Sequence, residues 1–520
     1  MQNDKQRIIQ NDAIPMSIRS LVRKYPTNQV NRLHYGGLPH LGNALWGAWS
    51  SHEIQSAADT YEDYSLSNNL QIPDFEEPNG EKTRLGGGSP ARFMPYQLCL
   101  DKMKEAVQLR TLSDYPLAAG DNADKAPIIE YFNKVYSLKI HENNIIFSHS
   151  STQAFTLIME AILDYGDVVL MSAPNYGLFS FIPERVGGRV RLLHLSPSDN
   201  WKTNPSELHQ RIIEINEELR HDYDVNRGKY IFRRSDIPPR VVAFININPH
   251  NPTGVVYGEG DRGLLLEISR LCKKEGVLVV DDLVYAGLEY DRTDPALPIC
   301  SLDEQFDNTV TIYSLSKSYG LAGIRSGMVI ANELVISLIR DKIFQLCDSL
   351  SVVQSSALAA VFSPNDNDIN ERELYLTRVT NEYYKRLVFV KAIILGRKNL
   401  SKSEVKILLN LLQVEHLVVN EEVDFAGIQG VDIVLEPRSG FFVLLDMTLL
   451  LGKRYKGFEI SNDRSLLQFL YTSGNIKALT GRAFCWSNPD QLVMRVTTVL
   501  EYPDLLRSFL RLKSSVEMLI

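Results

Sequence analysis

The sequence has few cysteines, no excess of positive charge and no long apolar run. Its 520 residues include five cysteines that are scattered and never spaced as a C-x-x-C pair, which argues against a disulfide framework and a structural zinc site. Lysine and arginine number 55 against 63 acidic residues, a net charge of −8, so nucleic acid is not an expected partner. Residues 1–16 are too polar for a secretory signal, and no segment is apolar enough to span a bilayer. We therefore expect a cytoplasmic protein with no membrane partner and no bound metal.

The chain does have ample material for a hydrophobic core. Hydrophobic residues make up 44% of it, and there are 23 Tyr and 20 Phe, which excludes a disordered or collagen-like chain. From about residue 144, short β-branched apolar runs alternate with helical patterns, and this alternation predicts an α/β fold with a mostly parallel sheet. The expected strands are residues 144–147, 167–171, 189–193, 241–247, 277–280, 309–313 and 326–330.

The two ends of the chain differ from this middle part. Residues 1–84 are polar and irregular, and residues 370–520 mix long helical patterns with a strand pair near residues 432–435 and 441–446. The expected division has three parts: an N-terminal extension with part of a small domain (1–95), a large α/β domain (96–360) and a C-terminal small domain (361–520).

Two charged stretches, residues 216–239 and about 396–432, interrupt the alternation of strands and helices. We interpret both as insertions, because neither continues the pattern. The aromatic residues of the N-terminal extension, Trp46, Trp49 and Tyr61, are interpreted as packing residues rather than as a cover for a site or a dimer surface, since buried aromatics most often belong to a core.

One segment matches the dinucleotide-binding fingerprint G-x-G-x-x-G by its letters. Gly258, Gly260 and Gly263 open a predicted helix, and Asp281 and Asp282 end the next strand at about the spacing of a ribose-binding acid. The fingerprint requires its first glycine directly after a strand, so that the backbone can approach the pyrophosphate. Here further residues, two prolines among them, separate the strand from the first glycine. We interpret the segment as a glycine-rich start of a helix and keep an NAD-dependent dehydrogenase as an alternative.

Polar and charged residues gather in the turns after three of the strands, where parallel sheets bind their ligands. Residues 248–254 read Asn-Pro-His-Asn-Pro-Thr-Gly, residues 282–285 read Asp-Leu-Val-Tyr, and residues 314–325 carry Lys317 among small residues and end in Arg325. Taken singly, these are a rigid turn, a strand end and a surface lysine. Taken together, they bring an acid, a phenol, an amide, a lysine and an arginine to one edge of one sheet.

The type, order and spacing of these residues resemble those of the class I/II aminotransferases, a family of fold-type I pyridoxal-phosphate (PLP) enzymes. The resemblance covers about residues 85–500. It implies an α/β fold in which a large domain with a mostly parallel seven-stranded sheet is joined to a smaller α+β domain. It also implies pyridoxal 5'-phosphate as cofactor, amino acid and oxo acid substrates, and a homodimer.

The resemblance assigns the catalytic roles to Lys317, Asp282 and Tyr285. Lys317 would hold the cofactor aldehyde as a Schiff base and, once released, move the proton at the substrate Cα atom. Asp282 would pair with the protonated pyridine nitrogen. Tyr285 and Asn251 would donate hydrogen bonds to the phenolate oxygen of the ring and keep it ionised.

The other assigned residues bind the substrate carboxylate, the ring or the phosphate of the cofactor. Arg495 would hold the α-carboxylate with two parallel hydrogen bonds, beside Gly88 and Asn251, and Tyr176 would cover the ring face. The phosphate would be held by hydroxyl groups at a helix N-terminus, by an arginine and by a tyrosine of the neighbouring subunit. These residues are Ser151, Thr152, Ser314, Ser316, Arg325 and, from the neighbour, Tyr115.

The sequence also departs from the family pattern. Ser150 stands where the family usually has glycine, and Thr480 replaces a common proline before Gly481. Members specific for dicarboxylates carry a second arginine beyond the lysine, whereas residues 348–357 contain none. We therefore do not expect an aspartate-type side-chain clamp in this segment, although Arg340, Arg482 or an insertion could replace it.

Two further classes of function remain open beside transamination. The same fold supports β- or γ-elimination, cyclisation as in aminocyclopropane-carboxylate synthases, decarboxylation and oxidation. A PLP-binding regulator with a DNA-binding module is the other class. It would need a basic N-terminal module, and residues 1–84 show neither a basic excess nor a helix-turn-helix pattern.

Overall fold

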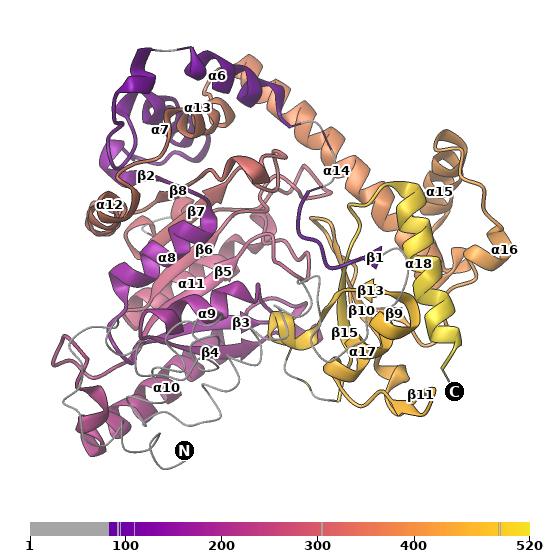
Figure 1. The fold of residues 1–520 in the computed structure, drawn as a ribbon. Helices are drawn as coiled ribbons and strands as arrows, with labels where there is room; N and C mark the ends of the chain where they lie inside the picture. The colour runs from indigo at the N-terminus through magenta and orange to yellow at the C-terminus, as the bar shows by residue number, and fades with distance from the viewer. Residues whose placement is uncertain are drawn as a thin grey trace, which may run out of the picture.

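The computed structural model describes residues 83–519, except residues 91, 92, 94, 109, 303, 304, 487 and 489. Trp46, Trp49 and Tyr61, and most of the segment expected to span residues 1–95, lie outside the described residues. The described chain forms two bodies, and the long helix α14 (Asp366–Leu395) runs from one to the other (Figure 1).

A seven-stranded sheet forms the centre of the first body. Its order is β2-β8-β7-β6-β5-β3-β4, and every neighbouring pair is parallel except the two made by β8. Each strand expected from the sequence is present close to its expected bounds, which confirms the mostly parallel α/β fold. The strands are β2 (Ile145–Ser148), β3 (Val168–Ala173), β4 (Arg189–His194), β5 (Val241–Ile247), β6 (Leu278–Asp282), β7 (Thr309–Ser314) and β8 (Gly327–Ile330).

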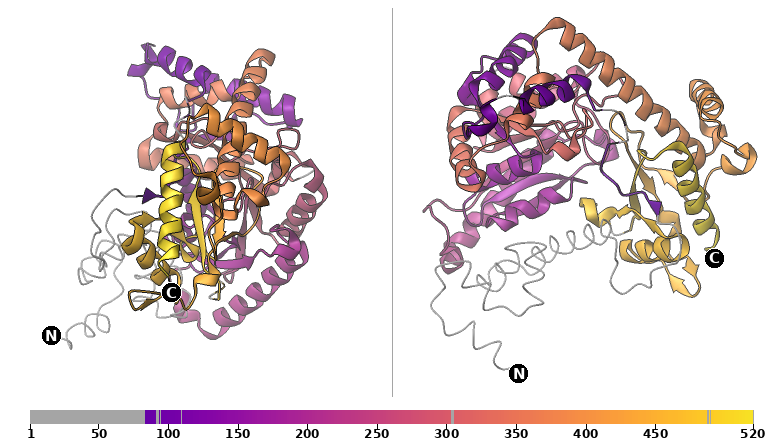
Figure 2. Two further views of the ribbon diagram at one scale, coloured as in Figure 1. Left: turned by 90° about the vertical axis from the view of Figure 1, so that its right-hand side faces the viewer. Right: turned by 45° about the horizontal axis from the view of Figure 1, so that its top comes forward.

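Helices cover both faces of this sheet, as the two views of Figure 2 show together with Figure 1. Successive residues of a strand point to opposite faces, so Val169 joins the hydrophobic cluster that contains residues of α8 (Ser151–Ile162), whereas Val168 joins the cluster on the other side, with α10 (Pro205–Val225) and α11 (Arg262–Lys274). Burial on both faces explains why the strands read as continuous apolar runs. The other helices of this body are α6 (Gln97–Val107), α7 (Asn122–Tyr136), α9 (Leu178–Arg185), α12 (Glu333–Cys347) and α13 (Val352–Val361).

The second body is built on an antiparallel sheet of order β14-β15-β10-β9. The strand pair expected near residues 432–435 and 441–446 is confirmed as β9 (Asp432–Ile433) with β10 (Phe442–Asp446). The first described residues belong to this body, because β1 (Thr83–Arg84) pairs with β13 (Ile476–Lys477). Its other elements are α15 (Lys402–Val414), α16 (Glu421–Asp424), β11 (Arg454–Tyr455), β12 (Phe458–Glu459), α17 (Asp463–Gly474), β14 (Leu479–Thr480), β15 (Val493–Thr497) and α18 (Tyr502–Glu517).

The two charged stretches interpreted as insertions contribute to the cores. The first begins inside α10, and Leu219 of that helix is buried against the sheet. The second carries α15 and α16 and buries Leu408, Leu411 and Phe425 in the core of the second body. Both stretches are therefore more than surface additions. Among the helices in the described part of the chain, none is long and apolar enough to cross a membrane.

Candidate active site

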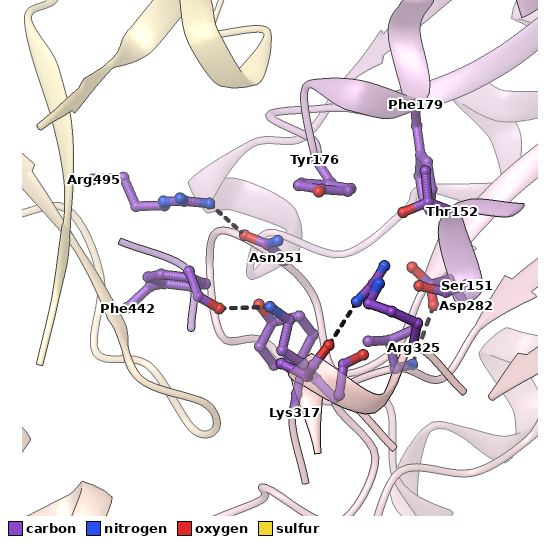
Figure 3. Close-up of a pocket in the computed structure, with 15 residues that line it drawn as sticks. Ser151, Thr152, Tyr176, Phe179, Asn251, Asp282, Lys317, Arg325, Phe442 and Arg495 are labelled. Carbon is purple, nitrogen blue, oxygen red and sulfur yellow. Dashed lines mark hydrogen bonds between the residues drawn. The ribbon is translucent and has the colours of Figure 1, made fainter. Parts of the chain in front are cut away.

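The turns that follow the strands of the large sheet meet the second body at one pocket (Figure 3). Most of the residues assigned from the sequence line it, and four lining residues were not assigned: Phe179, Val284, Ala322 and Phe442. The complete lining is Gly88, Ser151, Thr152, Tyr176, Phe179, Asn251, Asp282, Val284, Tyr285, Ser316, Lys317, Ala322, Arg325, Phe442 and Arg495.

Lys317 projects into this pocket from the loop after β7. Its Nζ atom donates a hydrogen bond to the carbonyl oxygen of Gly88 at 2.5 Å. The pKa of Lys317 is lowered to about 8, mainly by burial and also by the positive charges of Arg495 and Arg325, while Asp282 acts in the opposite direction. The amine is therefore much closer to its neutral, nucleophilic form at physiological pH than an ordinary lysine.

Asp282 ends β6 and faces the same pocket. Its carboxylate accepts a hydrogen bond from the backbone N–H of Val284 at 3.1 Å. The pKa of Asp282 is raised to about 7, mainly by burial and also by the neighbouring Asp281, while the hydrogen bond from Val284 and the charge of Lys317 act in the opposite direction. A cation placed against this buried carboxylate would stabilise its ionised form.

The adjacent acid Asp281 points the other way, as alternation along a strand requires. Its two oxygens accept hydrogen bonds from the Asn246 side chain at 2.7 Å and from the backbone N–H of Ile299 at 2.9 Å. Of the two acids at the end of β6, only Asp282 lines the pocket. Asp281 instead connects β6 by hydrogen bonds to β5 and to the segment that begins at Ile299.

At one end of the pocket, Ser151 and Thr152 begin helix α8, whose first backbone N–H groups favour an anion. Ser150, just before the helix, has φ 99° and ψ 162°, a conformation that glycine usually adopts. Gly327 makes room for this turn, because a Cβ atom there would lie 3.0 Å from the carbonyl carbon of Ser150 and 3.1 Å from the nitrogen of Ser151. Ser150 therefore holds a backbone conformation that glycine would adopt without strain.

Ser316 and Arg325, in the loop after β7, complete that end. Ser316 and Arg325 line the pocket, and the Arg325 side chain donates to the carbonyl of Ala322 at 2.9 Å. Ser314 does not line it. Its hydroxyl lies 3.0 Å from both the Ser316 hydroxyl and the Ser326 carbonyl oxygen, so it supports the loop.

At the opposite end, Arg495 of β15 is buried between the two bodies (Figure 3). Its guanidinium donates to the Asn251 side-chain oxygen at 3.1 Å and to the Gly86 carbonyl at 3.3 Å. The guanidinium carbon also lies 4.0 Å from the centre of the Phe442 ring. Three contacts therefore hold a cation at the end of the pocket opposite Arg325.

Asn251 is held by a turn with two cis peptide bonds, Asn248–Pro249 and Asn251–Pro252. Inside the turn, His250 contacts the Thr253 hydroxyl at 2.8 Å through Nδ1 and the Ser172 hydroxyl at 3.2 Å through Nε2. Burial lowers the pKa of His250 to about 4, so the ring is neutral at physiological pH. This histidine links the Asn251 turn to the end of β3.

Aromatic rings cover the remaining walls. Tyr176 follows the cis peptide bond Ala173–Pro174 after β3, and its ring packs edge-on against Phe179 with the centroids 5.3 Å apart. The Tyr285 ring lies 6.2 Å from the ring of Phe442. Phe442 could not be assigned from the sequence, because it reaches Arg495 only through the register that pairs Leu444 with Arg495.

Several other candidates lie away from this pocket. Tyr115 is 89% exposed and does not line the pocket of its own chain. Arg340 pairs with the neighbouring Asp341, and neither Arg340 nor Arg482 is among the lining residues. Gly258 precedes the short turn Glu259–Asp261 that leads into α11, which agrees with a glycine-rich start of a helix.

The chain matches the family described as aminotransferase class I and II over residues 83–392. It is 24% identical over 291 residues to the LL-diaminopimelate aminotransferase of Nitratidesulfovibrio vulgaris, covering 56% of this chain and 67% of that protein. It is 25% identical over 261 residues to the glutamate-pyruvate aminotransferase of Haemophilus influenzae, covering 50% of this chain and 56% of that protein. A probable aspartate/prephenate aminotransferase of Aquifex aeolicus is 23% identical over 83% of this chain and 90% of its own.

Solved structures show the same fold. The aspartate aminotransferase from Rhizobium meliloti superposes with a TM-score of 0.66 and 19% identity, covering 90% of this chain and 96% of that one. The aromatic aminotransferase from Pyrococcus horikoshii superposes with a TM-score of 0.61 and 19% identity, covering 84% and 96%. With the family match spanning more than half of its length, the chain belongs to the class I and II aminotransferases, which are PLP-dependent transferases of fold-type I.

Proposed function

We propose that the chain is a PLP-dependent aminotransferase that acts on an amino acid through Lys317. The observation that carries this proposal is the order of groups along one pocket. A partly buried lysine stands beside a buried carboxylate, between an anion-binding end at Ser151 and Arg325 and the separate cation Arg495. That order matches PLP bound with its phosphate at the Ser151 and Arg325 end and its aldehyde at Lys317. The carboxylate of the substrate would then lie at the Arg495 end.

The chemistry of the lining residues fits PLP. Bound there, PLP would act as an electron sink for the substrate Cα carbon. Asp282 is a buried carboxylate whose raised pKa would fall beside the protonated ring nitrogen. Tyr176 offers a flat aromatic face, and Ser151, Thr152, Ser316 and Arg325 offer donors for three phosphate oxygens.

Lys317 would carry the chemistry of the protein itself. Its depressed pKa provides a neutral amine that can bond to the cofactor aldehyde and that can later accept the proton from the substrate Cα atom. Asn251 and Tyr285, which line the pocket beside it, would donate hydrogen bonds to the ring oxygen. The Gly88 carbonyl, which now accepts from Nζ, would orient the amine.

Arg495 would bind the α-carboxylate of the amino acid. A guanidinium presents two parallel N–H donors that match a carboxylate. Its place on the Phe442 face and against Asn251 fixes the direction of those donors. The cations among the described lining residues are Lys317, Arg325 and Arg495, and each already has a role. We therefore propose an amino acid without a side-chain carboxylate as the first substrate class to test.

We further propose that the protein works in the cytoplasm as a homodimer. Exposed apolar residues gather on α12, namely Leu334, Leu338, Phe344 and Leu346. Leu346 lines a shallow surface pocket together with Thr152 and Arg325, so a subunit that covers this helix would reach the phosphate end of the site. The exposed Tyr115 is the side chain proposed to enter from the partner.

An absorption scan of the purified chain with PLP, followed by borohydride reduction and peptide mass mapping, tests the function. A visible band that disappears on reduction, with the pyridoxyl mass on Lys317, is expected. Conversion of the bound cofactor to its pyridoxamine form by an amino acid would indicate transamination. Turnover without that conversion would indicate elimination, cyclisation or decarboxylation. A chain that binds no PLP would refute the proposal, and a Lys317→Ala variant is the control for the labelled site.

A further inference from the structure

Arg325 sits in a backbone conformation that needs support. Its φ of 58° and ψ of 56° are left-handed helical, which disfavours any residue with a Cβ atom. The conformation lets the chain turn from the short helical segment Ala322–Ile324 into β8 while the Arg325 side chain lines the phosphate end of the pocket. If the backbone relaxed at this residue, the guanidinium would leave that position.

The support comes from Gln354, in the first turn of helix α13. Its Nε2 atom donates to the Ile324 carbonyl at 2.7 Å and to the Arg325 carbonyl at 3.1 Å. Its own backbone carbonyl accepts a hydrogen bond from the Ser326 hydroxyl at 3.0 Å. One glutamine therefore contacts three consecutive residues, with the left-handed residue in the middle.

The orientation of this amide is fixed by chemistry. Two carbonyl oxygens face its end, so only the NH₂ group can point toward them, since a reversed amide would bring oxygen against oxygen. The other end, Oε1, is buried and has no hydrogen-bond partner in the described part of the chain. A buried acceptor left without a partner is unfavourable, and this suggests that the two donor contacts decide where the amide lies.

Helix α13 is a rigid base for this contact. It packs against α6 and α7, and Ala357 and Leu358 are completely buried in the main core. The hydroxyl of Ser355, next to Gln354, donates to the Asp124 carboxylate of α7. Gln354 itself does not line the pocket, so it can act only through the residues that it holds.

We infer that Gln354 is a positioning residue for cofactor binding: it holds the left-handed turn at Arg325 and thereby aims the Arg325 guanidinium at the phosphate. The inference rests on the proposed function, because the phosphate is that of PLP. It gives a role to the segment of residues 348–357, in which the sequence offers no arginine for a substrate side chain.

The test compares PLP with pyridoxal, which has the same ring and aldehyde but no phosphate. The full-length chain, freed of cofactor, is titrated with each compound and binding is followed by visible absorbance. Gln354→Leu keeps the approximate volume and removes both donors. We expect its dissociation constant for PLP to rise about tenfold or more, while that for pyridoxal stays within about twofold. Ser356→Ala, which removes a hydrogen bond inside the same helix, is the matched control and should change neither.

A double-mutant cycle with Arg325→Ala separates positioning from general support of the fold. In the Arg325→Ala background, Gln354→Leu should cause no further loss of PLP affinity. An equal loss for PLP and pyridoxal, or a loss that persists without Arg325, would overturn the inference. If Gln354→Leu does not fold, Ser326→Ala removes the third contact, and a selective loss of PLP affinity is again expected. Failure of the wild-type chain to bind PLP would instead refute the proposed function.

Discussion

At the scale of single residues, the site depends on how burial and charge act on two neighbouring groups. Lys317 and Asp282 are both withdrawn from water, which makes the charged form of each less favourable. Burial lowers the pKa of Lys317 to about 8 and raises that of Asp282 to about 7. Both groups therefore titrate near physiological pH, which suits the proton transfer proposed for Lys317, whereas a protonated ring nitrogen would lower the pKa of Asp282 again.

Asp282→Asn should keep the shape of the site and remove the charge proposed to face the ring nitrogen. Leaving that nitrogen without its partner should reduce the rate of amine transfer by about two to four powers of ten, from a penalty of about 3–5 kcal/mol for a broken buried ion pair. The rate of conversion of bound cofactor by an amino acid measures this effect. Asp281→Asn, one residue earlier and outside the pocket, is the matched control and should lower stability more than rate. Equal rate losses in the two variants would contradict the assigned role.

The reactivity of Lys317 should depend on pH in a specific direction. Only the neutral amine attacks an aldehyde, so the rate of reductive labelling of Lys317 by pyridoxal should rise with pH, pass its midpoint at about pH 8 and level off above it. The charge of Arg495 lowers the pKa of Lys317, so Arg495→Leu should move the midpoint to higher pH. Labelled peptide quantified by mass spectrometry across the pH range provides the measurement. A wild-type midpoint near the ordinary lysine value of 10.5 would disprove this account.

At the scale of elements, the start of α8 holds a residue with a Cβ atom in a conformation that favours glycine. Ser150 has the torsion angles of a glycine, next to a helix whose N-terminus faces the pocket. The close approach of Gly327 to Ser150 leaves the turn little freedom to relax. The strain is therefore held in place by β8, the strand that runs antiparallel to its neighbours.

Ser150→Gly should stabilise the chain by about 1 kcal/mol, because residues other than glycine in this region cost about 1–3 kcal/mol and glycine loses part of that gain through its flexible unfolded state. The same change at Ser151, which is helical, relieves no strain and should destabilise the chain by up to about 1 kcal/mol. Urea unfolding of the two variants gives the comparison. Destabilisation by Ser150→Gly would show that the turn is not strained.

Much of the element order could be predicted from the sequence. The strands β3, β5, β6 and β7 are buried on both faces, and such strands read as uninterrupted β-branched runs. The turns that follow them carry most of the pocket, so the motifs and the site coincide. The antiparallel direction of β8 has no such signature, because strand direction depends on the connections and not on composition.

The sequence could not predict contacts that depend on register or on backbone torsion angles. Phe442 reaches Arg495 only because β10 and β15 pair with Leu444 opposite Arg495. Gln354 reaches the carbonyl of Arg325 only because that residue is left-handed. Ser314 is a similar case, since its motif position indicates a phosphate ligand whereas its hydroxyl supports the loop. The proposed domain boundaries at residues 95 and 360 stay predictions.

At the scale of the whole molecule, the proposed homodimer predicts that Tyr115 of each chain completes the site of its partner. The side chain is 89% exposed, which is unusual for a tyrosine without a partner surface. If each site combines Lys317 of one chain with Tyr115 of its partner, Lys317→Ala and Tyr115→Ala should impair the site through different chains.

Complementation between subunits tests this arrangement. Each variant alone should form an impaired homodimer. A heterodimer with one chain of each kind, purified through two different tags, should contain one intact site and recover about half of the wild-type activity. Light scattering should give the mass of a dimer. A heterodimer no more active than its parents, or a fully active monomer, would rule out the shared site.

Helix α14 has a mechanical consequence for the molecule. It is 30 residues long, about 45 Å at the rise of an α-helix. Tyr375, Leu376 and Tyr383 belong to the hydrophobic cluster of the first body, and Leu387 and Phe389 belong to that of the second. Because each end of α14 is packed in the core of one body, a rotation of the second body relative to the first must bend α14. The stiffness of this one helix between Tyr383 and Leu387 therefore limits how far the Arg495 end of the pocket can swing relative to Lys317.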